Sequence, residues 1–254
     1  MSAALDKAII GLITLETRLV ACRERLRAHT DSEALHDLRT TVRRLRSLLR
    51  PLRGLPGIDR LELAAKAVGE LTTPLRDHEV LAAHLAAHGH LGLAGQRLRR
   101  ARRAFSTVAA SSQLTTLMRL LDAVVPLLRA AEHSGGITGL GRRIDKRLGK
   151  QWHKLGQAMA DPAHDRHRLR LLIKRVRYAA EAYPERQTHS AKLGKALKNA
   201  QGALGDWHDR LQWLALAEQQ PELAPMVEGW HAALAEACAK SDKALAKLAH
   251  AMED

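Results

Sequence analysis

The chain has 254 residues, which is enough for one large domain or two small ones. Its 41 Lys and Arg residues outnumber its 27 Asp and Glu residues, and the formal net charge of +14 favours a polyanionic partner. Aromatic residues make up only 3%, whereas proteins that bind single-stranded nucleic acid stack bases on aromatic side chains. The composition therefore favours recognition of phosphate groups and argues against recognition of bases.

The N-terminal sequence MSAALDKAIIGLITLETRLV predicts an amphipathic helix rather than a signal peptide, because acids interrupt it and no cleavage pattern follows. No run of about 18 apolar residues occurs, so we expect no membrane span. Cys22 and Cys238 are far apart and form no CxxC motif, as in proteins of a reducing compartment. Together these features predict a cytoplasmic protein with no membrane partner.

An all-α fold is predicted, because no alternating strand pattern and no hairpin signal occur. Thr30-Asp31-Ser32 is a candidate N-cap cluster before the second helix, and Pro74 predicts a kink or break within the third. Small polar residues at 106–112 are expected to interrupt the very basic helix that precedes them. The helices predicted in the first half cover about residues 4–28, a segment ending near Pro51, residues 58–88, residues 96–103 after a loop at 89–95, and an apolar segment ending near Ala131.

The segment His133-Ser134-Gly135-Gly136 is the best linker candidate and lies near the midpoint of the chain. We predict two four-helix repeats, residues 1–132 and residues 138–254, joined by a linker at 133–137. In the second half, Asp161-Pro162 is expected to mark a helix start. The helices predicted around it are one that carries Arg143 to Lys154, one from His167 to near Pro184, one over about residues 190–219, and a last one after Pro221 and Pro225 that ends near His250.

A basic stretch from Leu35 to Arg53 organises the first half. At about 100° per residue, its apolar positions share one helix face and predict a buried stripe: Leu38, Val42, Leu45 and Leu49. The neighbouring arc carries the first basic stripe: His36, Arg39, Arg43, Arg46 and Arg50. Arg44 points elsewhere, and Asp37 is the one acid beside the stripe, where it is expected to weaken anion binding.

The stretch from His167 to Tyr183 repeats this plan. Its second basic stripe is His167, Arg170, Lys174 and Arg177, beside an apolar stripe of Leu169, Ile173, Val176 and Ala180. The two histidines are 131 residues apart, and Leu75-Arg76-Asp77 matches Trp207-His208-Asp209 at an offset of 132. Two matched anchors at nearly one offset indicate an internal duplication.

Each basic stripe has two interpretations. Like charges one helical turn apart repel by roughly 0.2–0.5 kcal/mol per pair, so the stripes need either internal acids or an external anion. Asp77 and Asp209 are candidate internal partners, which would orient the arginines together with Arg76. The duplication and the net charge favour the anion. Further cations at helical spacing extend the basic surface: Arg143, Arg147, Lys150 and Lys154 in one set, and Lys192, Lys195 and Lys198 in another. The run from Arg97 to Arg103 is either a solvated face or a peripheral part of the anion groove.

The motifs resemble those of the CHAD family, the conserved histidine α-helical domain. The family pattern H-x-x-R-x-x-x-[RK]-[RK]-x-R occurs twice and in order, from His36 and again from His167, and each copy is followed by an Asp motif, at Arg76-Asp77 and His208-Asp209. The resemblance covers nearly the whole chain, although His208 stands where the family often has Asn. It implies two four-helix bundles related by a pseudo-twofold axis, with both basic helices facing a shared cleft. It also implies binding of inorganic polyphosphate and association with polyphosphate granules. Many members are fused to a CYTH triphosphatase domain, for which this chain has no room.

The histidines leave alternatives open. His36 and His167 either contact phosphate or cap their helices, and a metal site is a third possibility that lacks a second ligand at suitable spacing. His84 and His88 form an HxxxH pair, but Leu85 stands where a metalloprotease has Glu, so we interpret them as surface residues. Trp207, Trp213 and Trp230 are expected in the core.

The leading hypothesis is a non-enzymatic module that binds inorganic polyphosphate and needs no cofactor. A metal-dependent phosphohydrolase or phosphotransferase is one alternative, but the clustered carboxylates or phosphate-binding Gly loop that it would need are missing. A sequence-independent nucleic-acid binder is the other alternative, and any contact with nucleic acid is expected to be non-specific. The predicted polyphosphate-binding set is His36, Arg39, Arg43, Arg46, Arg50, Arg143, Arg147, Lys150, His167, Arg170, Lys174, Arg177, Lys195 and Lys198, with Arg76, Asp77 and Asp209 in supporting positions.

Overall fold

The computed structural model describes residues 2–161, 163, 165–186 and 189–253. Within these residues the regular secondary structure consists of α-helices and short 3-10 turns, with no strand, which confirms the predicted all-α class. The contacts divide the chain into two compact units, residues 1–145 and residues 146–254. In the described part of the chain, none of the helices combines the length and the hydrophobicity that crossing a bilayer requires.

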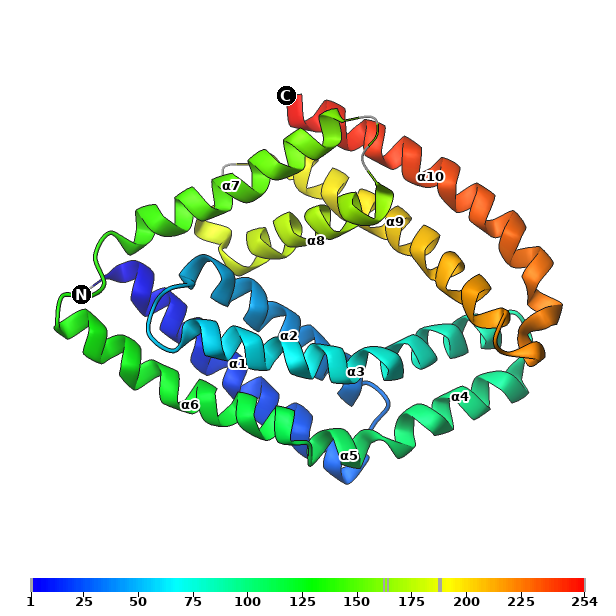
Figure 1. Cartoon of the computed structure of the whole chain (residues 1–254), viewed down its shortest axis with the longest axis horizontal. Helices are drawn as coiled ribbons and strands as arrows, with labels where there is room; N and C mark the ends of the chain where they lie inside the picture. Colours follow the sequence, from blue (N-terminus) through cyan, green and yellow to red (C-terminus); the bar gives the residue numbers. More distant parts are fainter. Residues whose placement is uncertain (1, 162, 164, 187–188, 254) are drawn as a thin grey trace. The chain divides into compact units, whose positions relative to one another are not determined.

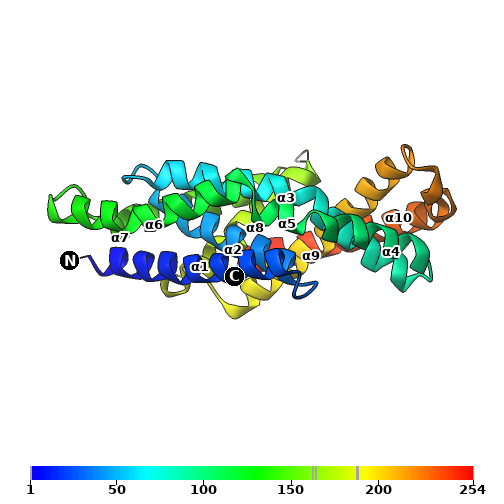
Figure 2. The same ribbon diagram turned by 90° about the horizontal axis from the view of Figure 1, so that it is seen from below.

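Four long helices form a bundle in the first unit. The helices α1, α2, α3 and α6 contact one another in a closed ring, so α1 and α3 lie diagonally across the bundle. Figure 2 shows α2 between α1 and α3. The bounds of these helices are α1 Ala3–Ala28, α2 Ala34–Leu49, α3 Ile58–Ala87 and α6 Ser112–His133. Two shorter helices complete the unit: α4 (Leu91–Arg103) packs against α3, and α5 (Phe105–Ala109) packs against α1.

The apolar stripe of α2 forms part of the core. Leu38, Val42, Leu45 and Leu49 are all at most 2% exposed, which confirms the predicted face. Beyond α2, the 3-10 turn η1 (Arg50–Leu52) contains Pro51 and ends the helical segment where the proline predicted it. The first basic stripe therefore lies on a helix whose neighbouring face is fixed by burial.

Several local predictions differ from the structure. The N-cap residue of α2 is Glu33, whose side chain makes no cap hydrogen bond, and Asp31 accepts from the Glu33 amide at 2.9 Å rather than from an amide within α2. Pro74 predicts a kink or a break, and the break does not occur: the helix α3 continues through the proline, with buried residues such as Val68 before it and Leu81 after it. The helix α4 begins at Leu91 rather than after Gly95, since glycines inside a helix are tolerated when neighbouring elements support it.

The second unit has its own core. The helix α7 (Leu140–Ala160) begins in the first unit, and most of it belongs to the second, with α8 (Arg166–Ala182), α9 (Ala191–Ala217) and α10 (Val227–Glu253). One cluster of buried residues joins all four helices: Leu155 of α7, Ile173 and Val176 of α8, Leu193, Leu197, Ala200 and Leu204 of α9, and Leu248 and Ala251 of α10. The helices α9 and α10 run side by side (Figure 1).

Helix ends and aromatic residues mostly follow the sequence. The side chain of Asp165 accepts a hydrogen bond from the Arg168 amide at the start of α8, and Ser190 does the same for Leu193 at the start of α9. Pro162, the predicted helix start, lies outside the described residues. The predicted core tryptophans are confirmed: Trp213 and Trp230 are buried, and Trp207 packs against the core cluster. The turns η2 (Pro184–Arg186) and η3 (Pro221–Met226) end α8 and precede α10.

Candidate functional site

Arg39 of the first basic stripe is held in place by neutral groups of α3. Its Nη1 donates hydrogen bonds to the carbonyl oxygen of Gly69 at 3.2 Å and to the hydroxyls of Thr72 and Thr73 at 2.9 and 3.2 Å. Burial lowers the pKa of the Arg39 guanidinium, and the charges of Arg76 and Arg43 lower it further, whereas Asp77 opposes the shift. The guanidinium keeps its proton, because arginine does not deprotonate in proteins. Arg39 is thus oriented without being neutralised by a hydrogen-bonded carboxylate.

Arg46 lies about two turns further along the same stripe. Its guanidinium lies beside Gly69 of α3, and its buried Nε has no hydrogen-bond partner among the described residues. A buried donor without a partner costs free energy, which a bound acceptor would recover. Arg46 is therefore a suitable position for an anion contact.

The C-terminal end of the first stripe is different, because a buried acid binds it. Glu62 of α3 lies 3.5 Å from the Nε of Arg50 and 2.5 Å from the Nε of Arg53. Burial alone would raise the pKa of the Glu62 carboxyl, but the hydrogen bond from Arg53 and the charges of Arg50 and Arg46 outweigh it, and the pKa falls below its usual value. Arg50 is therefore partly neutralised inside the unit, unlike Arg39.

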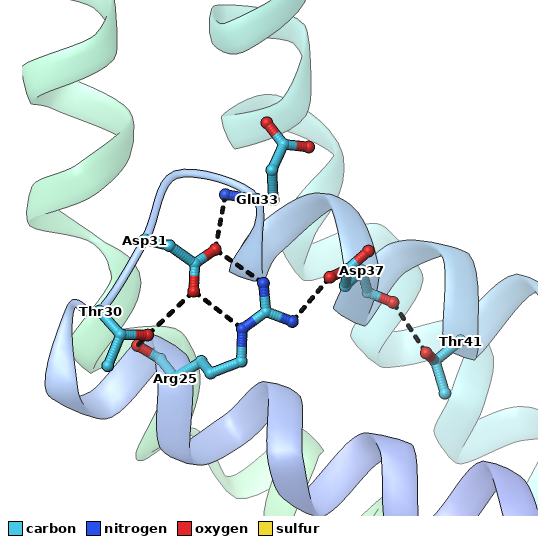
Figure 3. A network of polar contacts seen from close by, with 6 residues as sticks. All are labelled: Arg25, Thr30, Asp31, Glu33, Asp37 and Thr41. Atoms are coloured by element: carbon cyan, nitrogen blue, oxygen red, sulfur yellow. Dashed lines mark hydrogen bonds and ion pairs between the residues drawn. The ribbon is translucent and has the colours of Figure 1, made fainter.

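Asp37, the acid beside the first stripe, is bound by a cation from another helix. Arg25 of α1 donates from Nη1 to Asp37 at 2.6 Å, and from Nη2 and Nε to the two carboxylate oxygens of Asp31 at 2.7 and 2.8 Å (Figure 3). Asp31 also accepts from the Glu33 amide at 2.9 Å, which ties the turn before α2 to α1. The interaction with Arg25 reduces the charge that Asp37 presents to the stripe, so its expected weakening of anion binding becomes smaller.

Arg177 of the second stripe is also held partly by a neutral group. Its Nε donates to the Gln201 side-chain oxygen of α9 at 2.6 Å, and Gln201 in turn donates to the Tyr178 hydroxyl at 3.1 Å. Its Nη1 donates to Glu181 at 2.6 Å, one turn along α8, where the Glu181 side chain is 43% exposed. Glu181 can therefore rotate into solvent when an anion competes for Arg177.

His208 of α9 faces the second stripe. Its ring lies 5.2 Å from the His167 ring between centroids. Burial lowers the pKa of His208 to about 4, and the charges of Arg170, His167 and Lys174 contribute to the shift. His208 is therefore neutral at pH 7 and adds a polar but uncharged group beside Arg170 and Lys174.

The capping alternative for the two histidines receives no support from the helix starts. The start of α8 is capped by Asp165, while His167 is exposed in the first turn. No side-chain cap is present at the start of α2, and His36 is half-buried. Both histidines lie at the N-terminal end of their stripes, where the helix dipole favours an anion.

The remaining predicted residues lie in separate places. Arg143 is in the first unit, where it donates to the Arg53 carbonyl at 3.4 Å, and Arg147 lies in the second. Lys150, Lys154 and Lys198 are exposed. Lys195 lines a cavity between α9 and α10. Arg97 is 5% exposed, so the basic run of α4 is not a uniformly solvated face.

Sequence reasoning missed a cationic row on the last helix. Lys240, Lys243, Lys247 and His250 of α10 line the same cavity as Lys195. Their spacing of i, i+3, i+7 and i+10 equals that of His167, Arg170, Lys174 and Arg177, so the pattern was present in the sequence. The sequence of α10 lacks the consecutive Arg and Lys residues that mark the basic stripe of α8.

His84 and His88 lie at the C-terminal end of α3. The His84 and His88 rings lie 4.1 Å apart between centroids, and the His88 Nδ1 donates to the His84 carbonyl at 2.8 Å, as at a helix end. In the described residues, His, Cys, Asp and Glu side chains nowhere gather in a group of three or more that could hold a metal ion.

The fold and the stripes define an all-α protein with one of the two matching basic stripes in each of two compact units. The model of the CHAD domain matches residues 15–218, so the chain belongs to the CHAD family. The structure is similar to the crystal structure of the CHAD domain from the plant Ricinus communis, with a TM-score of 0.72 and 26% sequence identity over 99% of this chain and 92% of that chain. The comparison with curated proteins found no match. A CHAD domain is generally a non-catalytic binding domain.

Proposed function

We propose that the protein binds inorganic polyphosphate through the two basic stripes and that it associates with polyphosphate granules. The observation that carries this proposal is the way in which Arg39 is anchored: a carbonyl and two hydroxyls orient the cation and leave its charge available. In the second unit, the neutral side chain of Gln201 holds the Arg177 Nε in a similar way, at 2.6 Å. Cations that neutral groups hold in place are prepared for an external anion, whereas cations paired with acids are not.

The chemistry of the stripes suits phosphate chains. Successive cations at helical spacing repeat about every 5.4 Å along each helix, and a planar guanidinium can donate two hydrogen bonds to phosphate oxygens. Each charge-assisted hydrogen bond contributes roughly 1.5–3 kcal/mol when it is shielded from water. Several such contacts together give tight binding, and the affinity should fall with salt as displaced counterions lose their entropic advantage.

The main test removes cations from both stripes. Replacing Arg39, Arg43, Arg170 and Lys174 with Gln should weaken binding of long-chain polyphosphate by at least about a hundredfold, since four charge-assisted contacts are lost. The matched control replaces Arg44 and Arg175, which lie on the same two helices but are exposed on another face. Circular dichroism and thermal unfolding establish that each variant keeps its fold. An unchanged affinity in the quadruple variant would place the binding site elsewhere.

Variants of one stripe at a time test the expectation that one polyphosphate chain contacts both. The pair Arg39→Gln and Arg43→Gln is compared with the pair Arg170→Gln and Lys174→Gln. If one chain uses both stripes, the stoichiometry stays constant and each pair weakens the same binding event. If each stripe binds its own chain, each pair removes one class of site.

The two alternative functions predict different results in the same assay. If the protein were a nucleic-acid binder, DNA or RNA would displace labelled polyphosphate as well as unlabelled polyphosphate does at the same phosphate concentration. A phosphohydrolase would release orthophosphate from the chain when Mg²⁺ is present. We expect polyphosphate to be the better competitor and to remain intact. A fluorescent fusion in cells should colocalise with polyphosphate granules, and the quadruple variant should lose that position.

A further inference from the structure

A cavity of about 390 Å³ lies between α9 and α10 in the second unit. Its lining is unusual in composition, because six of its side chains are Lys or His and no Asp or Glu of the described chain contributes to it. The described residues that line it are Lys192, Lys195, Ala196 and Asn199 of α9, and Lys240, Lys243, Ala244, Lys247, His250 and Ala251 of α10. The three alanines and the aliphatic stems of the lysines make most of the lining apolar, and α9 and α10 each contribute Lys side chains to it.

The cations form a row along α10. Lys240, Lys243, Lys247 and His250 repeat at the spacing of one helix face, and ten residues of α-helix rise about 15 Å. Lys192 and Lys195 supply charge from the opposite wall. Like charges at i, i+4 repel one another, so Lys243 and Lys247 disfavour each other until an anion enters.

The acids near this cavity leave most of the charge uncompensated. Glu236 pairs with Lys240 at 2.7 Å, on the surface of α10. Asp242, next in sequence to Lys243, is bound instead by Arg166, whose Nη2 lies 2.7 and 2.9 Å from its two oxygens. Within the described chain, Lys195, Lys243 and Lys247 make no ion pair or hydrogen bond. Three lysines are thus available to a ligand.

The cavity is separate from the second basic stripe. On α9, Gln201 and His208 are the residues that meet Arg177 and His167 of α8. At about 100° per residue, Lys195 lies roughly 120–140° around the helix from these two. A ligand in the cavity and a ligand on the stripe therefore contact different faces of α9.

We propose that this cavity is a second phosphate-chain site, in which lysines bind a short run of phosphates from inorganic polyphosphate. The choice of polyphosphate rests on the proposed function. Among the described residues, the lining contains no Phe, Tyr or Trp for stacking and no arginine fork for base edges, which disfavours nucleic acid. Lysine is a compact point charge that binds phosphate oxygens from many directions, which suits a flexible chain of identical groups.

The test uses tripolyphosphate and measures protection of individual lysines from an amine-acylating reagent, read by mass spectrometry. It is performed in the Arg170→Gln, Lys174→Gln background, so that occupancy of the second stripe does not contribute. Lys195, Lys243 and Lys247 should become several-fold less reactive as tripolyphosphate is added, whereas Lys7, Lys66 and Lys146 should not change. Equal protection of all six lysines, or no protection, would overturn the proposal.

Two triple variants complete the test with long-chain polyphosphate. Lys195→Gln, Lys243→Gln and Lys247→Gln should weaken overall binding by about tenfold, as expected for three solvent-exposed ion pairs. The control Lys7→Gln, Lys66→Gln and Lys146→Gln removes the same charge elsewhere and should have little effect. Equal losses in both variants would contradict a defined site. If the stripe variants bind normally while the cavity variant does not, the proposed function of the stripes fails and the cavity site stands. Equal displacement by single-stranded DNA would contradict the ligand class.

Discussion

The two basic stripes have the same spacing, but the groups that hold them differ. The first stripe ends at Arg50, which pairs with Glu62, an acid whose side chain is 9% exposed. The second ends at Arg177, whose acidic partner Glu181 lies on its own helix and is 43% exposed. One carboxylate belongs to the core of its unit, while the other can move into water.

A second difference concerns the groups on the neighbouring helix. Arg76 of α3 adds positive charge near Arg39, while His208 of α9 at the matching position is neutral beside Arg170 and Lys174. The neighbouring helix thus presents a permanent cation, Arg76, near the first stripe and a neutral imidazole, His208, near the second. Cations with the same spacing in the sequence are therefore not equally available to a ligand.

The largest expected effect concerns the buried acid of the first unit. Glu62→Gln should lower the free energy of unfolding by about 2 kcal/mol, because Arg50 and Arg53 lose a partner whose removal leaves buried charge behind. The value lies below that of a fully buried pair, since the Arg53 side chain is 55% exposed and water can solvate it. Thermal unfolding should show a decrease of several degrees.

The control for this prediction comes from the second unit. Glu181→Gln removes an exposed i, i+4 pair with Arg177 and should change the free energy of unfolding by less than about 0.5 kcal/mol. It should also strengthen polyphosphate binding slightly, because Arg177 gains availability. Similar losses of stability in the two variants would mean that the stripes are held alike.

His208 should make the stability of the second unit depend on pH. Its pKa is about 4 in the folded protein, against an ordinary value of 6.5, so the unfolded chain binds more protons between these pH values. Stability should therefore be complete above pH 6.5 and decrease as the pH falls towards 4. His208→Asn should reduce this slope in thermal unfolding, while His78 and His189, whose pKa values are also lowered by burial, keep their own contributions.

The same residue should couple polyphosphate binding to protons. A bound anion favours the charged imidazolium, so the affinity for polyphosphate should rise as the pH falls from 7 to 5. The affinity of the His208→Asn variant should rise less over the same range. His208→Arg makes the position equivalent to Arg76 and should increase affinity at pH 7 while removing most of the pH dependence. Identical pH profiles in the three proteins, measured by binding titration, would contradict contact between His208 and the ligand.

Much of the fold follows from periodicity in the sequence. The buried face of α2 and the boundaries of α1, α8 and α9 are predictable, because apolar positions at helical spacing have one stable arrangement in a bundle. The continuity of α3 through Pro74 is not, since contacts with neighbouring helices outweigh the lost hydrogen bond there. Local signals predict elements well, and tertiary contacts decide where an element continues.

The candidate site divides in the same way. The cations of each stripe are visible in the sequence, but their partners are not, because Thr72, Glu62 and Gln201 lie on other helices. The spacing alone assigns Arg39 and Arg50 the same role, whereas the structure gives one neutral partners and the other an acid. Which cations remain available depends on contacts between helices that no short motif encodes.

The smallest expected effect concerns Asp37, the acid beside the first stripe. Because Arg25 binds both Asp37 and Asp31, Asp37→Asn leaves the second carboxylate in place and should cost about 0.5 kcal/mol of stability or less. Polyphosphate affinity should change by less than about twofold, since the carboxylate is already compensated by Arg25. The matched variant Arg25→Gln leaves Asp37 uncompensated beside the stripe and should weaken binding more than Asp37→Asn changes it. A large gain in affinity for Asp37→Asn, measured by titration at low salt, would show that the carboxylate acts on the stripe despite Arg25.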